Sequence, residues 1–363
     1  MKHDTAIPAG RRVYIDFLKV IAIYLVLFNH TGVSGFVLFT VRQGTKMYFP
    51  LMFNAILIKI AVPLFFMASG ALLLGKEESY GDLLRKRFLR FLVVLVVASL
   101  ISYLYTCLRQ GSQTLSAAYF WTMLYTHNLA GSYWYLYAYL AYILMLPLLR
   151  KLAKAMTAQE YRWMFLLYGV VHLLQILEFL IWKGGKSHNS YFSLFIALDY
   201  VFYPLMGYYI DRCMKDAEFT VRRLLTMTAV SVAAIVVCCL MTHYICTLTG
   251  GWDEENCQTF FSTLIFLPTV TVYYGVKLLF LRHPPTERLK KIIVAASETT
   301  FGLYLINHIC LEETIPVFAA LYPHYAGADC VLDMDALRLP SGRRHHLPCE
   351  EDSRRLQVPV GSI

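Results

Sequence analysis

The stretch that decides the fold is YIDFLKVIAIYLVLFNH, which runs from Tyr14 to His30. It lies in an apolar run, Val13 to Leu38, that is long enough to cross about 30 Å of hydrocarbon as a helix. Similar runs recur as far as Leu321, and the chain of 363 residues is 58% hydrophobic and only 16% charged. Because such a composition cannot cover most of these residues with a water-facing surface, we predict a multi-pass integral membrane protein in contact with the lipid bilayer.

Nine apolar runs predict an all-α fold, a polytopic membrane helix bundle of about nine helices. We expect these helices at residues 13–38, 51–74, 88–105, 133–149, 163–182, 192–210, 224–247, 260–281 and 300–321. The first run is too long for a signal-peptide core and lacks a small-residue cleavage site, so we expect it to be retained.

The net charge of +9 comes from short basic clusters that lie between the apolar runs. The clusters fall on alternate connections, at residues 2–12, 76–90, 150–162, 212–223 and 282–291. Short basic loops stay in the cytoplasm, so this pattern predicts a cytoplasmic N-terminus in a cell membrane. We therefore assign the positive charge to topology and expect no nucleic-acid partner.

The end of the chain differs in composition from the rest. Residues 326–363 contain no Phe, Trp or Tyr, although the whole chain is 15% aromatic, and they hold clustered arginine and acidic residues. We predict a membrane domain over residues 1–325 and a polar, disordered tail over 326–363. A shifted reading frame or a truncated gene model is the origin that we expect for this tail.

Three ionisable residues share one face of the first apolar run. At 100° per residue, Lys19 and His30 differ by only about 20° around the helix axis, and Asp16 and His30 differ by about 40°. At 1.5 Å per residue, Lys19 and His30 are about 16 Å apart along that face. Because ionisable residues within a membrane normally face the protein interior or a water-filled cavity, this face predicts a site that could hold a long donor with an anionic head.

This pattern of an aspartate, a basic residue, ten further residues and a histidine resembles the acyltransferase 3 family. Three more segments resemble family motifs in the family's order: VPLFFMASGALLL at 62–74, SYWYLYAYLAYILMLPLL at 132–149 and FGLYLINH at 301–308. The similarity covers residues 12 to 321. The family usually has arginine where this chain has Lys19, and lysine lacks the planar fork that grips a phosphate with two bonds. The family also has a tenth membrane helix, in place of which this chain has the polar tail.

The resemblance implies an acyltransferase of bacterial cell-envelope glycans. Its donor would be a cytoplasmic acyl-coenzyme A, most simply acetyl-coenzyme A, and its acceptor a hydroxyl of an envelope glycan or lipid-linked sugar. His30 and Asp16 are then the predicted catalytic residues, with His30 as the general base, because a neutral imidazole can take a proton from a hydroxyl near working pH. Lys19 and Arg12 are the predicted donor-binding residues.

Other polar residues are candidates for the substrate pocket. If alternate helices run in opposite directions, Lys59, Glu178 and Asp199 lie near the level of His30. Asp199 either orients the imidazole or neutralises Lys59 in a buried pair. Ser69 is a further pocket candidate, but a Ser-Gly pair in a membrane helix commonly allows close helix packing, and we do not expect it to be catalytic.

Two further candidates lie in the family-like segments. Trp134 would line the acceptor path or anchor the protein at the membrane surface, and His308 would form a wall of the site. No spacing of cysteines and histidines predicts a metal site, although Cys246 and Cys257 could pair across a loop. A transporter or polysaccharide exporter without acyl transfer remains the alternative, because charges within a membrane also mark substrate pathways. The oligomeric state is left open.

Overall fold

The computed structural model describes residues 8, 10–32, 35–110, 115–183, 194–252 and 257–325. The chain divides into two compact units, Met1–Ile315 and Pro316–Ile363. Both pockets described below lie in the first unit. Of the second unit only residues 316–325, the end of helix α13, are described, so the predicted tail at 326–363 lies outside the described residues.

All regular secondary structure in the described part of the chain is helical, which confirms the predicted all-α class. The α-helices are α1 Val13–Asn29, α2 Tyr48–Ile58, α3 Ala61–Leu73, α4 Tyr80–Asp82, α5 Leu89–Gln110, α6 Ala117–Thr126, α7 Trp134–Ala155, α8 Ala158–Trp182, α9 Asp199–Tyr208, α10 Val221–Thr249, α12 Phe266–Arg282 and α13 Glu287–Tyr325. Short 3-10 turns lie at Leu38–Val41, Gly131–Tyr133, Phe195–Ala197 and Asp216–Glu218, and π-helical turns at Leu83–Phe88 and Tyr209–Cys213.

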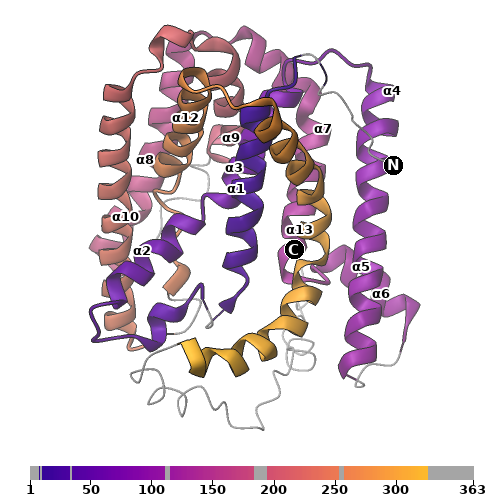
Figure 1. The fold of residues 1–363 in the computed structure, drawn as a ribbon, viewed down its shortest axis with the longest axis vertical. Helices are drawn as coiled ribbons and strands as arrows, with labels where there is room; N and C mark the ends of the chain where they lie inside the picture. The colour runs from indigo at the N-terminus through magenta and orange to yellow at the C-terminus, as the bar shows by residue number, and fades with distance from the viewer. Residues whose placement is uncertain are drawn as a thin grey trace, which may run out of the picture. The chain divides into compact units, whose positions relative to one another are not determined.

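Six helical segments of the described residues are long and apolar enough to cross a membrane. They are Tyr48–Leu73, Tyr80–Arg109, Gly131–Ala155, Ala158–Trp182, Val221–Thr249 and Glu287–Thr314. The predicted count of nine is not confirmed, because α1 and α12 have 17 residues each and α9 has only 10. These three shorter helices carry many buried side chains. In Figure 1, α1 and α3 run through the middle of the first unit, with α8 and α10 on one side and α5 on the other.

The predicted first and second helices are shorter or interrupted in the structure. Helix α1 ends at Asn29 rather than at residue 38, and Gly32 follows with a φ of +55°, a left-handed conformation that glycine adopts easily. The predicted helix at 51–74 is split into α2 and α3, with Lys59 and Ile60 between them. Both interruptions place polar side chains at helix ends, where they border a pocket.

Two glycines allow α3 and α9 to touch through their backbones. A Cβ atom at Gly70 would lie 1.9 Å from the Pro204 carbonyl oxygen, and one at Gly207 would lie 2.0 Å from the Met67 carbonyl oxygen. No larger residue fits either position without moving a helix. Gly70 is therefore a packing residue, the role that the Ser-Gly pair suggests in a membrane helix.

Polar contacts tie the N-terminal end of α1 to two neighbouring elements. Arg12 forms an ion pair with Asp211, and the Tyr14 hydroxyl donates a hydrogen bond to the same carboxylate. Lys277 of α12 donates to the backbone carbonyl oxygens of Ile210, at 2.8 Å, and Asp211, at 3.0 Å. These contacts fix the position of α1 relative to α12 and the end of α9.

Candidate active site

A pocket among the described residues lies at the C-terminal end of α1, and we call it the histidine pocket. It has a volume of about 620 Å³. Its polar lining residues are Asn29, His30, Lys59, Ser132, His172, Asp199, Tyr200, Ser262 and Tyr304, and its apolar walls include Phe66, Trp134 and Tyr135. His30 caps α1, Lys59 caps α2 and Asp199 begins α9. Helix ends therefore gather these three polar side chains around one cavity.

Lys59 and Asp199 have different partners, so the structural pair considered for them is not formed. The Lys59 ammonium donates to the Gln258 side-chain oxygen at 2.6 Å and lies 4.5 Å from the centre of the Phe36 ring. Asp199 accepts a hydrogen bond from the Tyr168 hydroxyl. Both charged groups are thus held in place on the pocket wall by polar neighbours.

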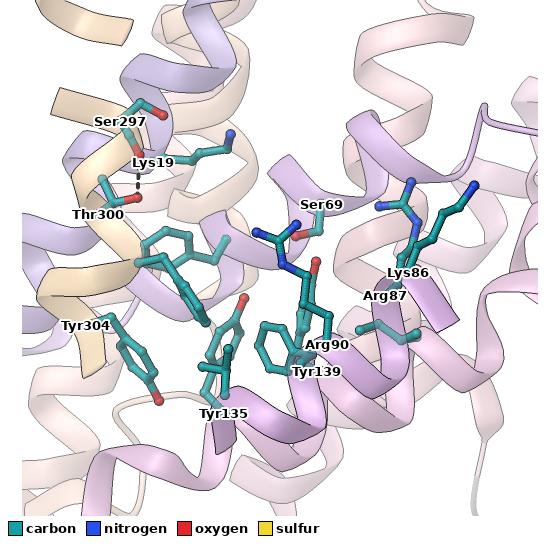
Figure 2. Close-up of a pocket in the computed structure, with 15 residues that line it drawn as sticks. Lys19, Ser69, Lys86, Arg87, Arg90, Tyr135, Tyr139, Ser297, Thr300 and Tyr304 are labelled. Atoms are coloured by element: carbon teal, nitrogen blue, oxygen red, sulfur yellow. Dashed lines mark hydrogen bonds between the residues drawn. The ribbon is translucent and has the colours of Figure 1, made fainter. Parts of the chain in front are cut away.

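A second pocket lies toward the N-terminal end of α1, and we call it the basic pocket (Figure 2). Its volume is about 410 Å³. Four cationic side chains line it, namely Lys19, Lys86, Arg87 and Arg90, together with Ser69, Ser297, Thr300 and aromatic residues that include Tyr135, Tyr139 and Tyr304. Lys19 comes from α1, whereas the other three come from the π-helical turn before α5 and the first turn of α5.

A buried carboxylate holds Lys19 at the basic pocket. Asp16 is 4% exposed and lies 3.3 Å from the Lys19 ammonium. It also accepts hydrogen bonds from Arg11, at 2.8 Å, and from the Ser297 hydroxyl, at 2.8 Å. Fourteen residues of helix, or about 21 Å, separate Asp16 from His30, so the two groups predicted to be catalytic do not meet. Asp16 is a positioning residue for Lys19.

An acidic residue outside the apolar helices holds Arg87 in the same way. Glu78 accepts a hydrogen bond from the Arg87 Nε at 2.9 Å and another from Arg150 at 2.7 Å. The hydrogen bond from Arg87, followed by that from Arg150, outweighs burial and lowers the pKa of Glu78 to about 2. Glu78 is therefore ionised at every physiological pH and keeps Arg87 oriented.

Two tyrosines form a wall shared by the pockets. Tyr135 and Tyr304 line both cavities, and their ring centres are 5.6 Å apart in an edge-to-face contact. The Tyr304 hydroxyl donates to the Ser132 carbonyl oxygen, which ties α13 to the start of α7. The basic pocket and the histidine pocket are thus neighbours that are separated by aromatic side chains.

The pockets bring together six of the ten predicted site residues. His30, Lys59, Trp134 and Asp199 line the histidine pocket, and Lys19 and Ser69 line the basic pocket. Four others line neither: Asp16, Arg12, Glu178 and His308. Arg12 forms the ion pair with Asp211 outside both pockets, and donor binding by Arg12 stays a prediction.

His308 lies beside the histidine pocket without lining it. Its Nε2 is 2.9 Å from the Ser102 hydroxyl. Its ring makes an edge-to-face contact with the Tyr133 ring, with the ring centres 5.5 Å apart. It is close enough to His30 for their side chains to interact electrostatically. Glu313, one helical turn further along α13, pairs with Arg109 at 2.8 Å and takes no part in the pocket.

Two signals of the site are missed by sequence reasoning, the cations at the start of the α5 segment and one histidine. The sequence analysis explains Lys86, Arg87 and Arg90 only as topology signals, although the spacing of three between the arginines places them on one helix face. His172 lies in the middle of the apolar helix α8, and an ionisable residue in such a helix is itself a signal of a functional site. Both signals were present in the sequence.

Within the described ranges no group of three or more His, Cys, Asp or Glu side chains could hold a metal ion. The Cys246 and Cys257 sulfur atoms are 3.4 Å apart, which is longer than a disulfide bond. The basic pocket offers four cationic side chains, and the histidine pocket offers two imidazoles, a lysine and a carboxylate.

A family model described as an acyltransferase domain matches residues 12–325. The chain belongs to the acyltransferase 3 family. The match covers most of the chain and includes every residue that lines the two pockets. Membership makes this protein an acyltransferase, and its apolar helices fit a membrane enzyme. Comparisons with curated proteins and with solved structures give no significant match.

Proposed function

We propose that this acyltransferase moves an acyl group, most simply acetyl, from acyl-coenzyme A to a hydroxyl of a bacterial envelope glycan or lipid-linked sugar. The donor binds in the basic pocket and the acceptor in the histidine pocket. The observation that carries this proposal is the arrangement of the two pockets, one cationic and one with an imidazole, on either side of Tyr135 and Tyr304.

The charge of the basic pocket supports a phosphate-bearing donor. Lys19, Lys86, Arg87 and Arg90 supply four cations, and the arginine forks can bind phosphate oxygens with two bonds each. Coenzyme A carries its phosphates at one end and its thioester at the other. With the phosphates among these cations, the thioester would point toward the tyrosine wall.

The basic clusters on alternate connections support a cytoplasmic donor. With the N-terminus on the cytoplasmic side of the cell membrane, Lys19 and Arg87 lie near that side and His30 lies in the outer half of the membrane. An acceptor on the outer surface would then reach the histidine pocket directly. The acyl group would cross the membrane between the two pockets, and Tyr135 and Tyr304 would turn aside to admit the thioester.

The reaction requires one base. A neutral His30 takes the proton from the acceptor hydroxyl as its oxygen attacks the thioester carbonyl carbon. The carbon–sulfur bond then breaks, an oxygen ester remains on the acceptor, and the thiolate leaves. The proton held by His30 passes to that thiolate, so the enzyme returns to its starting state and one coenzyme A is released.

Reconstituted protein tests this function. Purified enzyme in lipid vesicles receives acetyl-coenzyme A labelled in its acetyl group, and the acceptor is the lipid-linked saccharide fraction of the producing cells. We expect an alkali-labile labelled ester on the saccharide and an equal amount of free coenzyme A. If acetyl-coenzyme A leaves the saccharide unlabelled but a longer labelled acyl-coenzyme A reacts, the transferred group is that longer acyl group. No labelling of the saccharide by any donor would overturn the proposal.

A further inference from the structure

His172 of α8 lines the histidine pocket, and one nitrogen of its imidazole is left to accept a hydrogen bond. Its Nδ1 lies 2.8 Å from the backbone carbonyl oxygen of Tyr168. A carbonyl oxygen can only accept a hydrogen bond, so Nδ1 carries the hydrogen. In the neutral ring the other nitrogen, Nε2, then has a lone pair and can only accept.

Aromatic neighbours hold this imidazole in place. Its ring stacks on that of Tyr168 with centres 4.2 Å apart and planes inclined by 29°, and the Phe266 ring lies 5.9 Å away. The side chain is half-buried and lines the cavity that also contains His30. Stacking and the Nδ1 hydrogen bond together restrict rotation of the ring, so the direction of Nε2 is fixed.

Asp199 is a second acceptor beside the first. It is exposed on the pocket wall, and the Tyr168 hydroxyl donates to one of its oxygens. A carboxylate has about four acceptor positions, so most of them stay available. Tyr168 thus organises both groups, His172 through its backbone and Asp199 through its hydroxyl.

We propose that His172 and Asp199 bind the hydroxyl groups of the acceptor that flank the reacting one, and that they make the enzyme specific for a sugar. This inference rests on the proposed function and adds the residues that select the acceptor. Two groups that only accept hydrogen bonds require a ligand with two donors close together, and neighbouring hydroxyls on a sugar ring supply them. Trp134, which is 47% exposed, offers the same pocket an aromatic face for the ring.

The test measures saccharide binding without any acyl donor. Purified protein in lipid discs is titrated with a tritiated lipid-linked saccharide fraction from the producing cells. His172→Phe keeps a stacking ring but loses both nitrogen atoms, and we expect it to weaken binding about tenfold, the effect of one or two net hydrogen bonds. His172→Gln restores an oxygen near the position of Nε2 and should recover part of the affinity.

Matched controls separate this role from folding and from the donor site. His243→Phe is the same substitution on α10, outside both pockets, and should leave saccharide binding unchanged. Acetyl-coenzyme A should bind equally to the wild type, His172→Phe and His243→Phe, because His172 does not line the basic pocket. Loss of donor binding in His172→Phe would show that this variant is damaged as a whole. The test then rests on His172→Gln, whose saccharide affinity must lie between those of His172→Phe and the wild type.

Three results would overturn the inference: a wild-type protein that does not bind the saccharide, equal saccharide affinity in wild type and His172→Phe, or displacement of the saccharide by octylamine but not by octyl glucoside. The last would show that Asp199 selects an ammonium group. A protein that binds saccharide through His172 but transfers no acyl group would refute the proposed function and leave this inference intact.

Discussion

The basic pocket and the histidine pocket differ in how their polar groups are held. In the basic pocket, cations are oriented by carboxylates, Lys19 by Asp16 and Arg87 by Glu78. In the histidine pocket, His172 and Asp199 are oriented by neutral groups of Tyr168. In our proposal, the first arrangement selects a ligand by charge and the second selects it by hydrogen-bond direction. The same proposal has one chain recognise an anionic donor and a neutral acceptor on either side of two tyrosines.

Removal of the proposed base should produce the largest effect. We expect His30→Ala to lower kcat by about 10² to 10⁴, the usual contribution of a general base, without changing the affinity for acetyl-coenzyme A. Single-turnover transfer in vesicles measures the rate, and equilibrium binding of the donor provides the control. Full activity in this variant would remove His30 from the chemistry.

Loss of an arginine from the basic pocket should affect only the donor. Arg87→Ala or Arg90→Ala is expected to raise the Kd for acetyl-coenzyme A about ten- to a hundredfold, because charged hydrogen bonds contribute about 1.5–3 kcal/mol each. Binding should also become less sensitive to salt, whereas saccharide binding stays constant. Arg162→Ala is a matched control, since Arg162 lines neither pocket. Equal donor affinity in all of these proteins would contradict the donor assignment.

A smaller effect is expected when Arg87 loses its carboxylate. Glu78→Gln should weaken donor binding several-fold, because Arg87 is then free to leave the pocket. The pKa of Glu78 is lowered from 4.5 to about 2 in the folded protein. Its ionised form therefore stabilises the folded protein above pH 4.5, and this contribution to folding stability is lost as the pH falls toward 2. Donor affinity measured between pH 5 and 8 should therefore show no titration of Glu78, and a transition in that range that disappears in Glu78→Gln would refute this interpretation.

The smallest change is expected at Lys19. Lys19→Arg should retain or improve donor affinity, because a guanidinium keeps the charge and adds a planar fork for phosphate. Lys19→Ala should weaken donor binding by less than the arginine variants do, because a lysine offers phosphate a point charge rather than the two parallel bonds of an arginine fork. Titration of the three proteins with acetyl-coenzyme A decides this, and an identical Kd in all of them would exclude Lys19 from the site.

The sequence predicted the helical class, the family and the residues at the two ends of α1. It misjudged features that depend on contacts between distant segments. Helical spacing places Asp16, Lys19 and His30 on one face, but it cannot show that Ser297 and Arg11 join Asp16, or that Arg90 lies opposite Lys19. Hydropathy merged α2 with α3 because both are apolar, although a turn at Lys59 and Ile60 separates the two helices.

A structure of His30→Ala with acetyl-coenzyme A tests most directly whether the two pockets form one reaction path. The variant cannot complete the reaction by the proposed route, so the donor should remain intact. We predict phosphates beside Lys19, Arg87 and Arg90, and a thioester between Tyr135 and Tyr304 that points toward the empty position of the imidazole. A donor whose phosphates lie in the histidine pocket, or outside both pockets, would contradict this assignment.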